Sequence, residues 1–189
     1  VDGVDLDMNA PEVAGMTPFG LLDHVAKARI GDQEGWGLFE HGTFGRHETH
    51  RQYVENVIGT QHGLDRYYTM NLLMLPGRTV FIADTYVNYD PTAEQLADMT
   101  LLAAAEIRNF GMHPKVALLS HSTFGTEETP TAIKMREVLR ILNQRAPKLE
   151  VEGEMHGDAA LDEQIRLAAF PNSRLKGQAN LLVMPTLDA

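Results

Sequence analysis

The 189-residue chain contains no cysteine and only one tryptophan. Without cysteine, disulfide bonds and thiolate chemistry are excluded. No apolar run approaches the roughly 20 residues that are needed to cross a bilayer, and the first residues do not resemble a secretory signal. We therefore expect a cytoplasmic protein that has no membrane partner.

Positive charge is also scarce, because 16 Lys and Arg residues stand against 26 Asp and Glu residues, giving a formal net charge of −10. The basic residues are scattered along the chain rather than clustered. This pattern argues against nucleic acid and anionic membranes as partners. Any anionic ligand would have to be held by a few local arginines.

The composition that remains is that of a soluble globular protein, with 43% hydrophobic and 22% charged residues. The length suits one domain, or one lobe with part of another. Val1-Asp2-Gly3 is an unusual start, and the chain stops at Ala189 shortly after an apolar strand. We therefore expect a segment of a longer polypeptide that is truncated at both ends.

The N-terminal third contains few periodic segments. Residues 1–15 read as an acidic tether, and a helix is predicted from Thr17, the N-cap, through Pro18 to a stop at Gly31. A short strand is predicted over residues 36–39. A second helix is predicted over about residues 47–58, because apolar positions recur at helical spacing before Gly59.

The remainder of the chain alternates between strand and helix patterns. Two strands, 69–75 and 78–83, flank the hairpin signal Pro76-Gly77, and a helix follows with Asp90 as its N-cap and Pro91 in its first position. Further elements are predicted as a strand from Lys115, a helix over 131–145, a short strand at Val151, a helix over 158–169 and a final strand over 179–184. This alternation predicts an α/β fold with a mixed sheet.

A polar loop follows the buried strand that begins at Lys115. The loop offers hydroxyl groups and free backbone N–H groups where the strand becomes a helix, a common place for anionic ligands in α/β proteins. Alternatively, it is an ordinary connection whose hydroxyl groups cap the helix. Its candidate ligand residues are Ser120, His121, Ser122, Thr123 and Gly125.

Two other polar groups lie next to predicted strands. Asp84 and Asn88 follow the strand 78–83, at an edge where ligands bind in open α/β sheets. Ser173 and Arg174 precede the last strand, and the guanidinium group can hold a phosphate or polarise a carbonyl. A solvent-exposed turn is the alternative for this second pair.

The histidines do not form a convincing metal site. His47 and His50 are one residue short of the zinc-protease spacing, and no third ligand is evident. We expect an exposed helical face here and no bound metal. His121, inside the polar loop, is a better candidate for contact with a bound ligand. The alternative is a histidine that flanks a helix and is hydrogen-bonded to the backbone. Glu154 and Asp158 are expected to cap a helix start.

Several sequence motifs occur in the order found in the phosphate acetyltransferase family, which the chain therefore resembles. The resemblance is strongest to the transacetylase-like domain at the C-terminus of bacterial NADP-dependent malic enzymes. The motifs are Gly42-Thr43-Phe44-Gly45-Arg46, Val57-Ile58-Gly59, residues 81–88, Asp90-Pro91-Thr92-Ala93-Glu94, residues 114–125, residues 150–155, and residues 171–177 with Pro185. The resemblance assigns residues 36–189 to this α/β segment and leaves residues 1–35 unplaced.

The resemblance implies a two-lobed, three-layer α/β/α fold of the isocitrate/isopropylmalate dehydrogenase type with a mixed sheet. It also implies that coenzyme A binds in the cleft between lobes and that this domain forms a homodimer within a larger homo-oligomer. By this resemblance, Ser173 and Arg174 match the family's catalytic pair, and Asn180 stands where the family has an aspartate base. An amide cannot accept a proton at neutral pH, so we expect binding without turnover.

Three hypotheses follow. The chain is an acetyl-CoA-binding regulatory and dimerisation domain of an NADP-dependent malic enzyme, an active phosphate acetyltransferase, or a purely structural oligomerisation module. Under the first, malate is oxidatively decarboxylated to pyruvate, with NADP and a divalent metal, by a domain absent from this sequence. The expected acetyl-CoA or coenzyme A ligands are Arg46, Asp84, Ser120, His121, Ser122, Thr123, Gly125, Ser173, Arg174 and Asn180.

Overall fold

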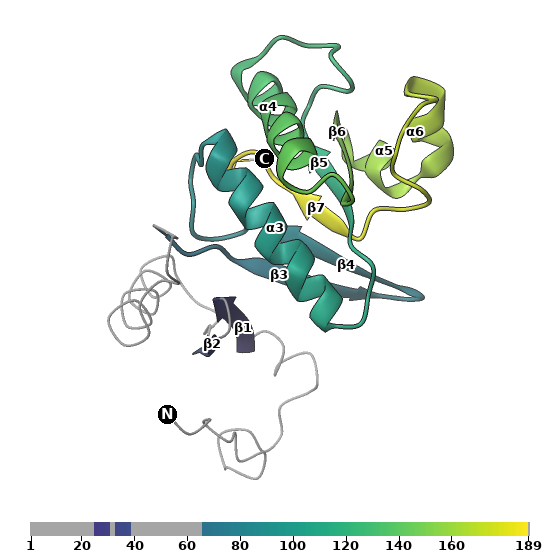
Figure 1. The fold of residues 1–189 in the computed structure, drawn as a ribbon. Coiled ribbons are helices and arrows are strands. Elements are labelled where there is room, and N and C mark those ends of the chain that lie inside the picture. The colour runs from purple at the N-terminus through teal and green to yellow at the C-terminus, as the bar shows by residue number, and fades with distance from the viewer. Residues whose placement is uncertain (1–24, 31–32, 39–65, 189) are drawn as a thin grey trace. The chain divides into compact units, whose positions relative to one another are not determined.

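The computed structural model describes residues 25–30, 33–38 and 66–188 (Figure 1). The chain divides into two compact units, Val1–Arg66 and Tyr67–Ala189. In the first unit, strand β1 (Val25–Ile30) pairs antiparallel with β2 (Gln33–Leu38). The predicted helix ending at Gly31 is therefore wrong over β1. Apolar residues that recur at helical spacing over only two turns are weak evidence for a helix. Here the backbone hydrogen bonds are made by pairing with β2 instead.

The second unit is built on a five-stranded mixed sheet in the order β3-β4-β7-β5-β6. Strand β3 (Met70–Leu75) is antiparallel to β4 (Arg78–Ala83), and Gly77 in the connecting turn has a φ of +76°. The other pairings, between β4, β7 (Leu181–Val183), β5 (Lys115–Leu119) and β6 (Glu150–Met155), are parallel. The predicted hairpin and mixed sheet are confirmed.

Helices cover both faces of this sheet. Helices α3 (Ala93–Asn109) and α4 (Pro130–Arg145) pack on one face, where Leu118 and Val183 join the larger apolar core (Figure 1). Ala117 and Leu182 point to the other face and pack with α5 (Gly157–Leu161) in a second core. The alternation of neighbouring strand residues between two cores explains the continuous apolar runs of β5 and β7. The α/β fold is confirmed.

Two helix boundaries differ from the predicted ones. Thr92, not Asp90, caps α3: its Oγ1 accepts from Gln95 N, while Thr92 N donates to Gln95 Oε1 at 2.8 Å, which forms a capping box. The predicted helix over 158–169 is two helices, α5 and α6 (Glu163–Ala169). Asp162 interrupts the run with φ −130° and ψ 115° and caps α6.

Candidate functional site

The parallel strands divide the candidate residues between two edges of the sheet. Asp84 directly follows β4, and Ser120 directly follows β5, so both lie at the carboxyl edge. Asn180 directly precedes β7 and bonds to Lys115, the first residue of β5, so it lies at the opposite, amino edge. The structure therefore does not bring the predicted ligand residues together in one place.

At the carboxyl edge, the loop 120–126 is folded around the carboxylate of Glu154, near the end of β6. Glu154 is fully buried, and its Oε1 accepts hydrogen bonds from Ser122 Oγ at 2.7 Å and from Gly125 N at 2.8 Å. Arg136 of α4 donates its Nη1 to the same oxygen at 3.1 Å. Glu154 therefore shapes this loop and does not cap a helix, contrary to the prediction.

Most hydroxyl groups of the loop are used within it. Ser120 Oγ accepts from Ser122 N, and Ser122 Oγ accepts from Glu127 N, each at 3.1 Å. Thr126 Oγ1 accepts from Thr123 N at 3.1 Å. Ser120 and Ser122 are buried, whereas Thr123 is only half-buried. The loop is thus a turn that its own hydrogen bonds hold in place, with His121, Gly125 and Thr126 exposed to solvent.

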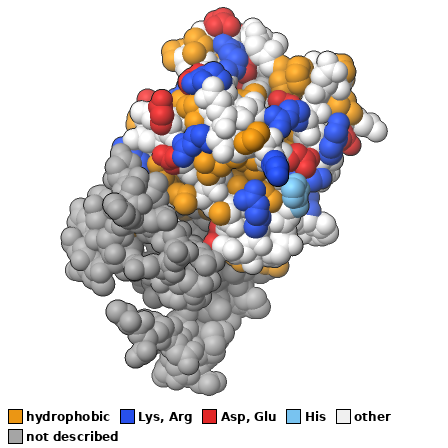
Figure 2. Space-filling model, in the orientation of Figure 1, with side chains coloured by type: hydrophobic (Ala, Val, Ile, Leu, Met, Phe, Trp, Pro, Cys, Tyr) orange, Lys and Arg blue, Asp and Glu red, His pale blue; other side chains and the backbone are white. Residues whose placement is uncertain are grey.

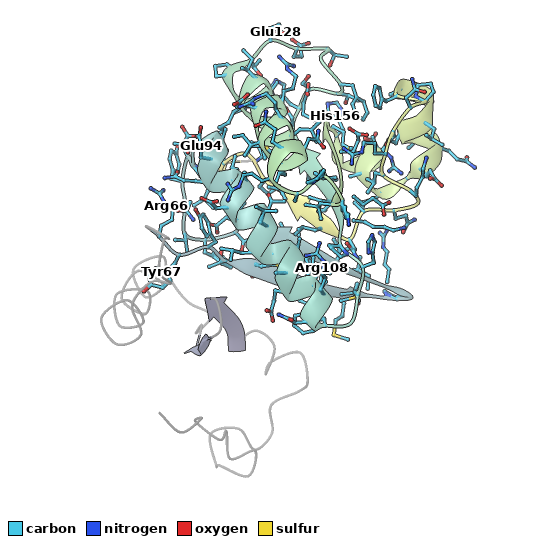
Figure 3. The ribbon with its side chains drawn as sticks, in the orientation of Figure 1. Arg66, Tyr67, Glu94, Arg108, Glu128 and His156 are labelled. Carbon is cyan, nitrogen blue, oxygen red and sulfur yellow. The ribbon has the colours of Figure 1, made fainter. Side chains whose placement is uncertain are left out.

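Two histidines lie beside this turn. His121 is exposed, and its Nε2 lies 3.1 Å from the Oγ1 of Thr129, the N-cap of α4. His156, labelled in Figure 3 where β6 ends, donates from Nε2 to the carbonyl oxygen of His121. The two imidazoles therefore stand at the same edge of the sheet, next to the helix start.

Asp84 has a structural task at the same edge. Its buried carboxylate accepts from Thr69 Oγ1 at 2.5 Å, from the backbone N–H groups of Tyr86 and Val87 at 3.0 and 3.2 Å, and from both N–H groups of Asn88. Five donors occupy both oxygens, which leaves Asp84 little capacity for a ligand. It orders the loop after β4 instead.

The residues at the amino edge are engaged with backbone and helix ends. Asn180 Oδ1 accepts from Lys115 N at 2.7 Å, and its Nδ2 donates to His113 O at 2.9 Å. Arg174 donates to Asn143 Oδ1 at 2.5 Å and to Pro147 O at 2.9 Å, at the end of α4. These contacts join β5 to β7 and the 173–174 segment to α4.

Ser173 is different from its neighbours. It is 2% exposed, and its Oγ has no hydrogen-bond partner among the described residues. Its carbonyl oxygen accepts from Lys176 Nζ at 3.3 Å. In the predicted pair, the hydroxyl group of Ser173 is therefore buried, and the guanidinium group of Arg174 is bonded at the end of α4.

The structural roles of three charged residues were not predicted from the sequence: Glu154, Arg136 and Arg166. Glu154 carried no signal of such a role, because glutamates alternate at positions 150, 152 and 154 of β6, a pattern typical of a solvent-exposed strand face, although Glu152 and Glu154 are buried. Arg166 is fully buried and donates to Ala159 O at 2.8 Å and Leu175 O at 3.2 Å. Nothing in the surrounding sequence distinguishes it from a solvent-exposed arginine.

Several expectations lie outside the described residues, namely Arg46 as a ligand contact, the helix over 47–58 and the histidines His47 and His50.

Among the residues that are described, no group of three or more His, Asp or Glu side chains could hold a metal ion. Within the same ranges, no helix is long and apolar enough to span a bilayer. Figure 2 shows Lys and Arg side chains interspersed with acidic and apolar ones on the face in view.

Comparisons with known proteins agree with this architecture. A family model described as phosphate acetyl/butaryl transferase matches residues 41–189. The NADP-dependent malic enzyme of Escherichia coli (strain K12) is 52% identical over 148 residues, which cover 78% of this chain and 20% of that protein. The phosphate acetyltransferase of Synechocystis is 36% identical over 132 residues, which cover 70% of this chain and 19% of that protein.

Solved structures show the same likeness. The EutD phosphotransacetylase from Staphylococcus aureus matches with a TM-score of 0.68 and 29% sequence identity, over 74% of this chain and 44% of that one. The chain spans about a fifth of the length of the curated relatives named above. The match of the family model over most of the chain shows that it belongs to the phosphate acetyl/butaryl transferase family.

Proposed function

We propose that the chain is an acetyl-CoA-binding regulatory and dimerisation domain of an NADP-dependent malic enzyme, and that it binds its ligand without transferring the acetyl group. The observation that carries the proposal is the internally hydrogen-bonded loop 120–126 at the carboxyl edge of the parallel strands, within a domain of this family. Similarity to malic enzymes, 52% in one case against 36% for a phosphate acetyltransferase, supports the choice of parent protein.

The ligand would meet the outward-facing part of the carboxyl edge. His121 and Gly125 are exposed there, and Thr123 is half-buried. Imidazole and hydroxyl groups can donate to the carbonyl and phosphate oxygens of acetyl-CoA. Arg46 lies outside the described residues, so its contact with the ligand stays a prediction from the sequence.

Binding without turnover is supported by the state of the buried carboxylates at this edge. Both oxygens of Asp84 already accept hydrogen bonds, and Glu154 is fully buried, so neither carboxylate is placed to take the proton of a bound thiol. Asn180 does not carry this argument, because it lies at the amino edge. Oxidation of malate, with its NADP and divalent metal, is assigned to another part of the polypeptide.

Active acetyl transfer to phosphate is the second candidate, and the phosphate acetyltransferases among the relatives favour it. A purely structural oligomerisation module is the third. Calorimetric titration of the full-length protein with acetyl-CoA, together with assays of acetyl phosphate formation and of malate oxidation, separates the three. We expect saturable binding, a changed rate of malate oxidation and no acetyl phosphate above a protein-free control.

Each contrary result has a definite reading. Acetyl phosphate formation that depends on the protein would establish the transferase and overturn the claim of binding without turnover. Absence of any acetyl-CoA binding, with a dimer still present by sedimentation, would leave only the structural module. Binding that leaves malate oxidation unchanged would contradict the regulatory role.

A further inference from the structure

The carboxylate of Glu154 is the most unusual buried group at the carboxyl edge. One oxygen, Oε1, accepts from three donors: Ser122 Oγ, Gly125 N and Arg136 Nη1. The other oxygen, Oε2, is buried and has no hydrogen-bond partner among the described residues. The carboxylate is therefore bound on one side only.

Such an arrangement is a poor means of stabilising a fold. A buried acceptor without a donor costs free energy, and a buried ion pair often contributes less than apolar packing of the same volume. A buried polar group that is only partly satisfied needs an explanation other than stability, and fixing a local conformation is one such role. Here the specified conformation is that of the loop 122–125.

The three donors come from separate parts of the edge. Ser122 and Gly125 belong to the two sides of the turn, and Arg136 belongs to α4, where it also donates to Glu127 O at 3.2 Å and pairs with Glu128 at 3.0 Å. Phe124 N donates to the backbone carbonyl of Glu154 at 2.8 Å. A single glutamate thus joins β6, the loop and the following helix.

We propose that Glu154 is a positioning residue for the ligand loop: with Arg136 as its counter-charge, it holds residues 122–125 in the conformation that receives acetyl-CoA. The inference rests on the proposed function. Glu154 does not itself reach the ligand, since its side chain is 1% exposed. Its effect on binding is transmitted through the loop's backbone and through Ser122.

The test compares two isosteric changes on the same strand, Glu154→Gln and Glu152→Gln, in the full-length protein. Glu152, two residues earlier in β6, is 5% exposed and also accepts from backbone, but its donor is Arg174 N and not the loop 120–126. We expect Glu154→Gln to weaken acetyl-CoA binding by about tenfold, because a neutral amide holds the loop's donors less strongly than the carboxylate and the binding conformation of the loop becomes less populated. For Glu152→Gln we expect a change of less than about twofold.

Hydrogen exchange supplies a readout that does not require ligand. Exchange in the peptide 119–127 is expected to accelerate in Glu154→Gln and not in Glu152→Gln, because Gly125 N–H loses its charged acceptor. If Glu154→Gln does not fold, Ser122→Ala replaces it, since that change removes one donor without leaving a buried charge unpaired. It is expected to show the same two effects at smaller size.

The outcomes separate the inference from the proposed function. The inference would be overturned if the Glu154→Gln variant folds and binds acetyl-CoA as well as the unaltered protein does. It would also be overturned if Glu154→Gln weakens binding no more than Glu152→Gln does. Failure of the unaltered protein to bind acetyl-CoA would overturn the proposed function. In that case, unchanged exchange in Glu154→Gln overturns loop positioning as well, and accelerated exchange supports it.

Discussion

Asp84 and Glu154 act alike at the scale of single residues. Each is a buried carboxylate at the end of a parallel strand, and each accepts from the backbone of a loop beside it. Hydrogen bonds to a carboxylate are shorter and stronger than neutral ones, so one side chain can order several residues. Asn180 is the neutral counterpart at the amino edge, where its amide pairs with one donor and one acceptor of the backbone.

Changing Asn180→Asp tests this assignment. The carboxylate can still accept from Lys115 N, but it has no donor for His113 O, and the two oxygens repel each other. We expect a loss of about 1–3 kcal/mol in the free energy of unfolding, measured with urea. Asn172→Asp, at an exposed position, is the control with no loss.

The same Asn180→Asp variant is expected to form no acetyl phosphate. The new carboxylate would lie at the amino edge, away from the loop 120–126. Recovery of acetyl transfer in this variant would show that the amino-edge position takes part in catalysis after all, as the family resemblance implied.

The Arg174→Ala variant tests whether Arg174 binds the ligand or only the end of α4. Its guanidinium group already bonds to Asn143 and Pro147. We expect stability to fall by about 0.5–1.5 kcal/mol, because these contacts are at the surface, while the affinity for acetyl-CoA stays the same. A loss of affinity in calorimetry, at unchanged stability, would favour the sequence-based prediction that Arg174 meets the ligand.

At the scale of elements, the glycines of the loop and of β6 have different tasks. Gly125 has a φ of +86°, and a Cβ built there would meet no atom within 4 Å. Gly153 has a φ of +153°, and a Cβ there would lie 2.7 Å from Leu118 Cβ. The first glycine serves the turn's conformation and keeps its surface open, whereas the second lets β6 approach β5.

Gly125→Ala and Gly153→Ala are therefore expected to behave differently. The first is expected to cost about 1 kcal/mol of stability, the strain of a left-handed conformation, and to weaken acetyl-CoA binding because the methyl group stands on the exposed face of the loop. The second is expected to unfold the domain. Thermal unfolding and calorimetry measure both, and equal loss of stability in the two variants would contradict the distinction.

Arg166 joins the elements on the second face of the sheet. It lies in α6, is fully buried, and donates to carbonyl oxygens of α5 and of the segment that leads into β7. Arg166→Met keeps the volume but leaves these carbonyls without donors, so we expect a loss of about 3–5 kcal/mol. Arg140→Met, which removes a surface pair with Glu137, is the control and is expected to change stability little.

At the scale of the whole molecule, the last described residues return to the carboxyl edge. Leu187 N donates to Tyr89 O at 3.0 Å, and Tyr89 Oη donates to Asp188 Oδ2 at 2.8 Å. The hydrogen bond to Asp188 raises the pKa of Tyr89 above its usual value. The segment after β7 is therefore held beside the loop that follows β4.

The raised pKa of Tyr89 has a defined sign for stability. The protonated phenol is favoured in the folded state, so its contribution is present below the unfolded pKa of about 10 and is lost as pH rises through the folded pKa. We expect Tyr89→Phe to lower the melting temperature slightly at neutral pH and not at strongly alkaline pH. A difference that persists unchanged at alkaline pH would contradict this account.

Local sequence determined the elements whose signals lie within a few residues. The Pro76-Gly77 hairpin and the strand from Lys115 formed as predicted, and the helix predicted over 131–145 formed as α4 (Pro130–Arg145), because turn chemistry and apolar periodicity act over short distances. Short apolar runs were ambiguous, and β1 formed where a helix was predicted, since pairing with β2 decided it.

Only the tertiary structure decided which polar residues meet. Glu154 is 32 residues from Ser122 in sequence, yet its carboxylate holds the loop, and Asn180 is 65 residues from Lys115, whose backbone it binds. The direction of each strand placed Ser120 and Asn180 at opposite edges. Sequence patterns report neighbours along the chain, whereas hydrogen-bond partners and sheet edges are set by the packing of distant segments.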